Sequence, residues 1–201
     1  MSTGLLVGLD ASAHRLRRRG QDITVRVAEL TDHDGRCTGH LLVIGTPTAG
    51  ALVRLQFRCL YADLGWDDTK SSNRLTMALD RIQVAGSGVL VYVEQDGRGH
   101  GLIGLARHLH NTQHPESPRV AAELPDLRCY RQAAAAVATL GLGSVRLLTD
   151  NPAKIAALLR AGVHVTPISL THHTPTATDT PSAKATVQDP PPLSARSRIE
   201  R

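Results

Sequence analysis

The segment at residues 124–154 constrains the fold of this chain more than any other part of its sequence, which there runs LPDLRCYRQAAAAVATLGLGSVRLLTDNPAK. Apolar residues recur at helical spacing over 129–140, and Gly141 is a natural end for a helix at that place. A short apolar run at 145–148 then predicts a strand, after which a second helix begins. Any fold of this chain must therefore place a helix, a strand and a helix in close succession here.

The junction between that strand and the second helix is suited to hold an anion. Asn151 can cap the helix, and Pro152 can occupy its first position, where a missing N–H is harmless. The free backbone N–H groups, with Thr149 and Lys154 beside them, could seat a phosphate. An ordinary strand-to-helix junction explains the same residues equally well.

The length of the chain and the distribution of its apolar residues limit the classes of protein to which it can belong. The 201 residues suffice for one domain with a real core and two tails. No apolar run approaches the roughly 20 residues that cross a membrane. The first twenty residues place their apolar side chains before their arginines, the wrong order for a secretory signal, so we expect a cytoplasmic protein.

The net charge, the aromatic residues and the cysteines limit which ligands and partners are expected. A formal net charge of +5 favours an anionic partner, either a nucleotide or a nucleic acid. Only five aromatic residues are present, too few for a platform that stacks single strands, and the basic run at 15–19 is generic, so we expect no nucleic-acid partner. Cys37, Cys59 and Cys129 are scattered and form neither a disulfide framework nor a CxxC zinc motif.

The chain divides into three regions. Residues 1–20 are expected to form a flexible basic arm, residues 21–168 the folded domain, and residues 169–201 a disordered tail rich in Ser, Thr and Pro. Within the domain we predict strands at 22–30, 40–44, 51–57, 89–93 and 163–165, with the first third mostly antiparallel. Further helices are predicted at 74–85 and from about 101 to 110, and residues 155–160 complete the helix that begins at Pro152.

A glycine-rich loop follows the strand at 89–93. Residues 99–104 match G-x-G-x-x-G, but the match is weak, because Glu123, the acidic residue at the required distance, does not end a predicted second strand and two prolines interrupt the unit. In a broader interpretation Gly97, Gly99 and Gly101 let the backbone approach a ligand, and Arg98 offers a planar donor fork to phosphate. A glycine-rich turn with a solvated arginine is the alternative.

Asp126 and Arg128 place a carboxylate and a guanidinium two residues apart. A surface ion pair of little energetic value is the simpler interpretation. In the other, Asp126 is a general base or orients Arg128 toward a phosphate. Of the histidines, only His100 lies within a candidate site, because it occupies the glycine-rich loop.

Three segments taken together resemble the GTP cyclohydrolase II family: ALVRLQFRCLYAD, VLVYVEQDGRGHGL and PDLRCYRQ…LGLGSVRLLTDNPAK. The resemblance covers about residues 22–168. It implies an α/β fold with a mixed sheet and flanking helices, and a homodimer. Members of the family open the imidazole ring of GTP and release formate and pyrophosphate.

The resemblance also assigns roles to single residues. Arg128 matches the arginine that attacks the α-phosphate, and Asp126 matches its partner. The residues that match contacts of the nucleotide in the family are Arg54, Asp96, Gly97, Arg98, Thr149 and Lys154. Mg²⁺ is expected to accompany the triphosphate.

The zinc site of the family does not carry over. Cys59 occupies the first cysteine position, but Thr69-Lys70-Ser71-Ser72 stands where the family has C-x-C. Serine and lysine are poor zinc ligands, so zinc is not expected. A mixed site rebuilt around Cys59 is the alternative, with donors from Asp63, Asp67, Asp68 or His100.

Four further departures fall on the base side of the family's site, where Arg58, Arg74, Leu105 and Leu109 replace a glutamate, a glutamine, a lysine and a tyrosine. The phosphate side is largely intact. The sequence thus predicts a zinc-independent homologue that binds GTP or a related purine nucleoside triphosphate and acts at the α-phosphate without opening the ring. Ring opening through a rebuilt metal site and a catalytically silent binding module are the alternatives.

Overall fold

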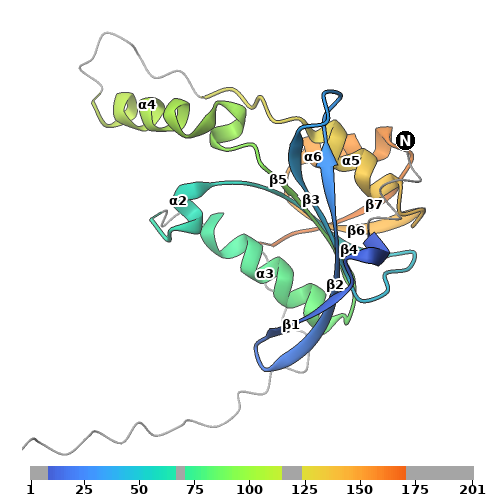
Figure 1. Cartoon of the computed structure of the whole chain (residues 1–201). Coiled ribbons are helices and arrows are strands. Elements are labelled where there is room, and N and C mark those ends of the chain that lie inside the picture. Colours follow the sequence, from blue (N-terminus) through green and yellow to red (C-terminus); the bar gives the residue numbers. More distant parts are fainter. Residues whose placement is uncertain (1–8, 67–70, 115–123, 171–201) are drawn as a thin grey trace, which may run out of the picture. The chain divides into compact units, whose positions relative to one another are not determined.

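The computed structural model describes residues 9–66, 71–114 and 124–170, and Figure 1 shows its architecture. The disordered tail expected at 169–201 lies outside the described residues from 171 onward. Within the described part the strands are β1 (His14–Arg18), β2 (Gln21–Thr31), β3 (Cys37–Ile44), β4 (Ala51–Phe57), β5 (Gly88–Val93), β6 (Ser144–Leu148) and β7 (His164–Ile168). The helices are α2 (Leu60–Asp63), α3 (Ser71–Val84), α4 (Gly101–Gln113), α5 (Tyr130–Ala138) and α6 (Pro152–Arg160), with a 3₁₀ turn at Gly97–Gly99.

The strands form one mixed sheet in the order β1-β2-β3-β5-β4-β6-β7. The antiparallel half, β1-β2-β3-β5, confirms the mostly antiparallel N-terminal part. β4 is the exception, because it lies beyond β5 and runs parallel to both β5 and β6. Its chain returns through α3 to the start of β5, and a crossover of this kind joins parallel strands.

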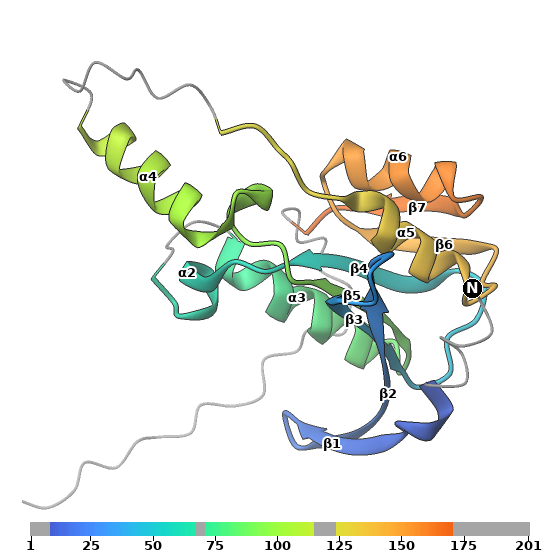
Figure 2. The same ribbon diagram turned by 45° about the horizontal axis from the view of Figure 1, so that its top comes forward.

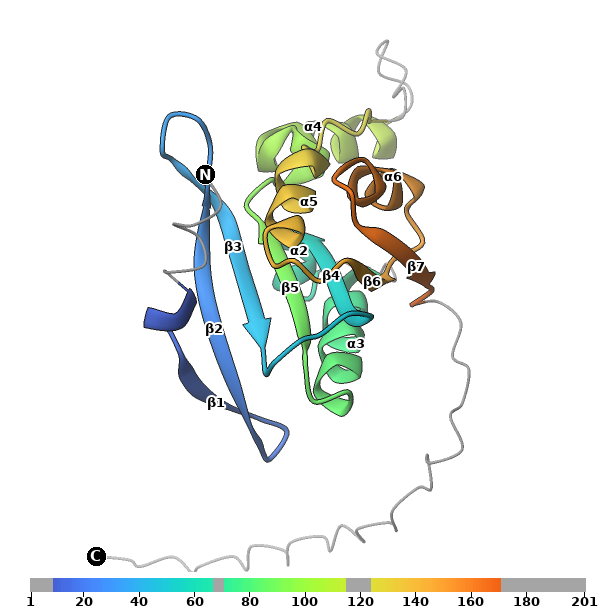
Figure 3. The same ribbon diagram turned by 90° about the vertical axis from the view of Figure 1, so that its right-hand side faces the viewer.

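Helices cover both faces of the sheet, as Figures 2 and 3 show from two sides. α5 and α6 pack their buried alanines, with Val137 and Leu158, on one face, against the alternate residues of β3, β4, β5 and β6. α3 packs Ala78 and Ile82 on the other face. The core continues past the expected end of the domain, because Leu170 is buried in the α3 cluster.

Residues 14–18 correct the expectation of a flexible arm. β1 pairs with β2 through a two-residue loop, Arg19-Gly20, in which both residues have positive φ, the geometry that suits a tight hairpin. The guanidinium groups of Arg18 and Arg19 lie 2.6 and 2.9 Å from Asp80 of α3. The ion pairs explain why a run of arginines is ordered at the sheet edge.

α4 differs from the other long helices because it buries none of its residues and projects away from the sheet (Figures 1 and 2). It packs mainly on the 3₁₀ turn that precedes it. No helix of the described chain has the length and apolar character that a membrane crossing requires.

Candidate functional site

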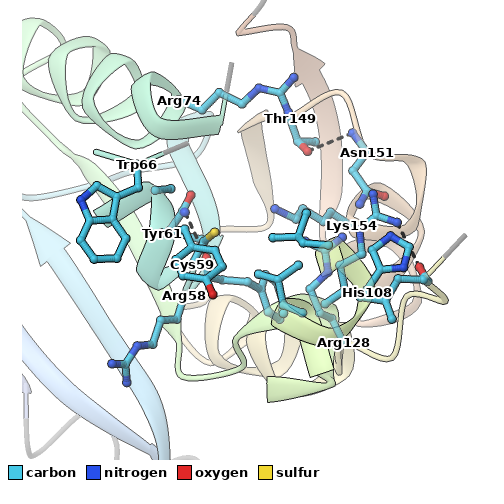
Figure 4. A pocket seen from close by; sticks show the side chains of 18 of the residues that line it. Arg58, Cys59, Tyr61, Trp66, Arg74, His108, Arg128, Thr149, Asn151 and Lys154 are labelled. Carbon is cyan, nitrogen blue, oxygen red and sulfur yellow. Dashed lines mark hydrogen bonds between the residues drawn. The ribbon is translucent and has the colours of Figure 1, made fainter. Parts of the chain in front are cut away.

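A cavity of about 760 Å³ lies where the parallel strands end. Its walls come from the residues that follow β4, β5 and β6, together with α2, α3, α4 and the loop before α5. In open α/β sheets ligands bind at this carboxyl edge. Figure 4 shows side chains of the residues that line it.

The lining is strongly cationic. Among the described lining residues six carry positive charge and one, Asp150, carries negative charge. The cations are Arg54, Arg58, Arg74, Arg98, Arg128 and Lys154. Such a concentration of one sign in a concave site attracts a polyanion.

Asp126 holds Arg128 in a bidentate pair. Arg128 donates from Nε to Oδ1 at 2.8 Å and from Nη2 to Oδ2 at 2.6 Å, and Tyr130 donates its hydroxyl to Oδ2 at 2.6 Å. The hydrogen bonds from Arg128 and Tyr130 hold the pKa of Asp126 well below its usual range, despite partial burial. Burial lowers the pKa of Arg128, but the Asp126 carboxylate outweighs it and raises that pKa above its ordinary value, so the guanidinium stays charged.

Arg128 faces the cavity, whereas Asp126 is not among the lining residues. The guanidinium lies 5.3 Å from the Phe57 ring centre and 5.4 Å from that of Tyr130. Cation–π contacts of this kind, together with the hydrogen bonds to Asp126, fix the orientation of the Arg128 guanidinium. Asp126 therefore positions Arg128 without itself lining the cavity.

The 3₁₀ turn and the Asp126 loop are locked together. Leu127 donates its backbone N–H to the carbonyl of Arg98 at 2.9 Å, and Arg98 Nη1 donates to the Leu124 carbonyl at 3.0 Å. A Cβ on Gly99 would lie 2.8 Å from the Leu127 carbonyl carbon, so only glycine permits this approach. The ring of His100 is hydrogen-bonded to the Pro125 carbonyl at 2.9 Å, so this histidine also holds the turn against the Asp126 loop.

Asp96 organises the same turn rather than lining the cavity. Its carboxylate accepts from the Gly97 N–H at 2.6 Å and from the Leu60 N–H at 3.2 Å, at the start of α2. Gly97 and Arg98 both line the cavity, and Arg98 has a left-handed φ of 57°. Of Asp96, Gly97 and Arg98, the first thus holds the turn and the other two face the cavity.

Arg54 and Lys154 form the buried floor of the cationic side. Arg54 donates to the Leu148 carbonyl at 2.8 Å and to Gln56 Oε1 at 2.9 Å, and Lys154 Nζ donates to the Leu55 carbonyl at 2.6 Å. Burial, and then the charge of Arg74, lower the pKa of Arg54 to about 10. Burial and the neighbouring arginines lower the pKa of Lys154 well below its ordinary value. A bound polyanion would favour the charged forms of Arg54 and Lys154 and would therefore raise both pKa values.

The junction after β6 has the predicted cap. Asn151 Oδ1 accepts from the Ala153 N–H at 2.8 Å, and Pro152 is at the helix start. Thr149 is buried and its hydroxyl oxygen accepts from the Asn151 N–H at 3.1 Å. Asn151 also donates to the Tyr130 hydroxyl at 3.2 Å, a link to the Asp126 loop that the sequence pattern does not reveal.

All four departures from the family's base side line the cavity: Arg58, Arg74, Leu105 and Leu109. Arg74 is notable because its buried Nε has no hydrogen-bond partner among the described residues. In Figure 4 its side chain points from α3 into the cavity, while Tyr61 and Trp66 lie away from Lys154 and Asn151. The rings of Tyr61 and Trp66 stack with centres 6.3 Å apart, and Trp66 is 73% exposed.

Among the residues that the structure describes, the donors near Cys59 do not form a zinc site. Among the described residues, the groups of three close metal-ligating side chains are Glu29-Cys37-His40 and Asp32-His33-Asp34, and neither includes Cys59. Asp63 accepts a hydrogen bond from Tyr92, and His100 is bonded to Pro125. The other proposed donors, Asp67 and Asp68, lie outside the described residues.

A cationic cavity at the carboxyl edge of parallel strands, beside a capped helix start, marks an α/β protein whose cavity is suited to an anionic ligand such as a phosphate. The sequence profile described as "GTP cyclohydrolase II" matches residues 19–168. The chain belongs to the GTP cyclohydrolase II family.

Several curated proteins are similar to it. A protein named "GTP cyclohydrolase-2" from Neisseria meningitidis is 37% identical over 131 residues, 62% of this chain and 66% of that protein. One of the same name from Azospirillum brasilense is 34% identical over 146 residues, 69% of this chain and 38% of that protein. "Riboflavin biosynthesis protein RibBA" from Bacillus subtilis is 38% identical over 120 residues, 57% of this chain and 30% of that protein. The chain thus spans just under two-thirds of the shortest of these relatives and about a third of the others.

Proposed function

We propose that the protein binds GTP or a related purine nucleoside triphosphate and acts at its α-phosphate, releasing pyrophosphate or transferring the nucleotidyl group, without opening the imidazole ring. One observation carries this proposal. The cavity gathers the family's phosphate-side residues, while its base-side positions are changed and Cys59 has no described partner ligands.

The geometry suggests an orientation for the nucleotide. The phosphates would lie against Arg54, Arg128 and Lys154, with the Thr149 junction beside them. The base would extend toward Tyr61 and Trp66, whose faces suit stacking. Arg98 would approach the phosphates from the 3₁₀ turn.

In this site Arg128 is better suited to clamp a phosphate than to attack it. A guanidinium must lose a proton to become a nucleophile, and the Asp126 carboxylate raises the pKa of Arg128 instead. Water or another acceptor would form the new bond to the α-phosphorus, and the bond to the bridging oxygen would break, so that pyrophosphate leaves. Arg128 and the other cations would stabilise the charge that develops on the phosphoryl oxygens.

Mg²⁺ would enter with the nucleotide, held by the triphosphate oxygens. Asp150 is the one carboxylate among the described lining residues and the nearest protein candidate for an inner- or outer-sphere contact. Mg²⁺ prefers oxygen ligands and keeps several waters, which a single carboxylate permits.

Ring opening is the second candidate, favoured by relatives whose names are "GTP cyclohydrolase-2". It would require a metal site built from Cys59 with Asp67 or Asp68.

The homodimer that the resemblance implies stays a prediction, and light scattering of the purified protein tests it.

The decisive experiment incubates the purified protein with Mg²⁺ and each of GTP, ATP and ITP, and separates the products by chromatography. We expect nucleoside monophosphate and pyrophosphate without formate, and no turnover by Arg128→Ala. Formate release would establish ring opening. Tight binding of every nucleotide without any product would establish a silent binding module.

A further inference from the structure

A second cluster of metal-ligating side chains lies on the antiparallel half of the sheet, on β2 and β3. Glu29 of β2 stands directly opposite His40 of β3 in the strand register, so their side chains share one face. Cys37 lies three residues before His40, a spacing that places two side chains on opposite faces of a regular strand.

A register shift brings Cys37 to the same face. Leu30 pairs with Gly39 but Thr31 pairs with Cys37, so β3 carries one extra residue at Thr38. An extra residue reverses the alternation of side chains beyond it, and bulges commonly re-aim a side chain in this way. The bulge therefore gathers a carboxylate, a thiol and an imidazole.

The three ligand atoms, one from each residue, all lie within 4.8 Å of one another. Cys37 Sγ is 3.9 Å from His40 Nε2. Glu29 and Cys37 are exposed and His40 is half-buried, which leaves the cluster open to solvent. Within the described chain no ion pair occupies the Glu29 carboxylate.

We propose that Glu29, Cys37 and His40 bind one divalent transition-metal ion of the zinc type, with a water molecule in the fourth position. Thiolate, imidazole and carboxylate are the donors that zinc accepts, and three of them with one open position form a complete tetrahedral set. The thiolate excludes Mg²⁺ and Ca²⁺ as preferred occupants, because both favour oxygen ligands. Small rotations of exposed side chains suffice to close the site around an ion.

This site is separate from the nucleotide cavity. His40 pairs with Tyr92 of β5, and Tyr92 pairs with Gln56 of β4, which lines the cavity. In this row His40 is two strand spacings from Gln56, about 10 Å, and Glu29 is three, about 14 Å. Zinc in the purified protein would consequently not by itself indicate the family's ring-opening site.

The test uses full-length protein without a histidine tag, kept reduced and freed of metal with a chelator. Co²⁺ titration should produce the thiolate-to-cobalt charge-transfer band and the visible bands of a tetrahedral site, with one ion per chain and displacement by Zn²⁺. Cys37→Ser should abolish the charge-transfer band. His40→Ala should weaken binding by roughly a hundredfold and Glu29→Gln by roughly tenfold, as loss of a ligand does.

Two cysteine variants are matched controls. Cys129→Ser and Cys59→Ser should keep the band and the stoichiometry, and the melting temperature of each metal-free variant verifies that it folds. A band that survives Cys37→Ser, no band in the wild-type protein, or a band lost in Cys59→Ser would each overturn the proposal. The last result would place the ion in the nucleotide cavity.

Discussion

The carboxylate of Asp126 and the guanidinium of Arg128 meet edge to edge, with hydrogen bonds of 2.8 and 2.6 Å from Arg128 Nε and Nη2 that leave Nη1 outside the pair. Planar pairing of this kind fixes both the position and the charge of the arginine. Asp126 is thus a positioning residue, and its contribution can be separated from that of Arg128.

The first prediction concerns stability and pH. Because the folded-state pKa of Asp126 is depressed, its stabilising effect is present above the ordinary pKa of 3.8 and is lost as pH falls from there through the folded-state value. Asp126→Asn should lower the free energy of unfolding by about 1 kcal/mol, a small cost because the side chain is one-third exposed. Denaturant unfolding should give the same difference between about pH 8 and pH 5 and a smaller one in stronger acid. A difference that grows in acid contradicts the assignment.

The second prediction concerns Lys154. Its pKa is lowered in the folded state, so between that value and the ordinary 10.5 the unfolded chain binds more protons and wild-type stability rises with pH. Lys154→Met removes this rise, because methionine fills a similar volume without a charge. The slope of unfolding free energy against pH, measured without nucleotide, checks it. Equal slopes for the two proteins would mean that Lys154 titrates normally.

The third prediction concerns Arg74, whose buried Nε lacks a hydrogen-bond partner within the described part of the chain. Arg74→Gln, which introduces the residue type that the resemblance assigns to this position, should weaken nucleoside triphosphate binding by roughly tenfold and reduce its salt dependence, since one cation leaves the cavity. Arg81→Gln is the control, because Arg81 is on the same helix but donates to the Ser169 carbonyl outside the cavity. Calorimetric titration at two salt concentrations measures both. Equal affinities for the two variants would exclude Arg74 from the site.

The fourth prediction separates two effects of replacing a glycine with alanine: the strain of a positive φ and the clash of the added Cβ with a neighbour. Gly99 and Gly101 have φ values of +92° and +72°, so alanine at either should lower stability by about 1 kcal/mol. Only Gly99→Ala should also impair pyrophosphate release, because its Cβ would displace Leu127, whereas the space around Gly101 is open. Thermal melts and product assays on both variants test this. Matching losses of activity in the two would show that the contact with Leu127 is unimportant.

Local patterns predicted much of the fold. Strand β4 and the Asn151 cap are where the sequence places them, because alternation, turn residues and capping chemistry act over a few neighbours. The sequence did not predict β1, because a run of arginines resembles a solvated arm until Asp80 of a distant helix is brought beside it.

The site was partly predictable for the same reason. Motif resemblance predicted that Arg54, Arg128 and Lys154 belong together, and the structure brings them to one cavity. It could not show that Asp96 and Asp126 lie outside the lining, since their roles depend on hydrogen bonds to Leu60 and Tyr130. Contacts across the fold decide which member of a motif meets a ligand.

The stacked pair of Tyr61 and Trp66 gives the protein an internal optical reporter. Trp66 is the only tryptophan in the chain and lines the cavity while remaining largely exposed to water. A base that stacks there would transfer the indole from water to a less polar contact. Occupancy of the site can therefore be followed by emission from a single residue, with no label attached.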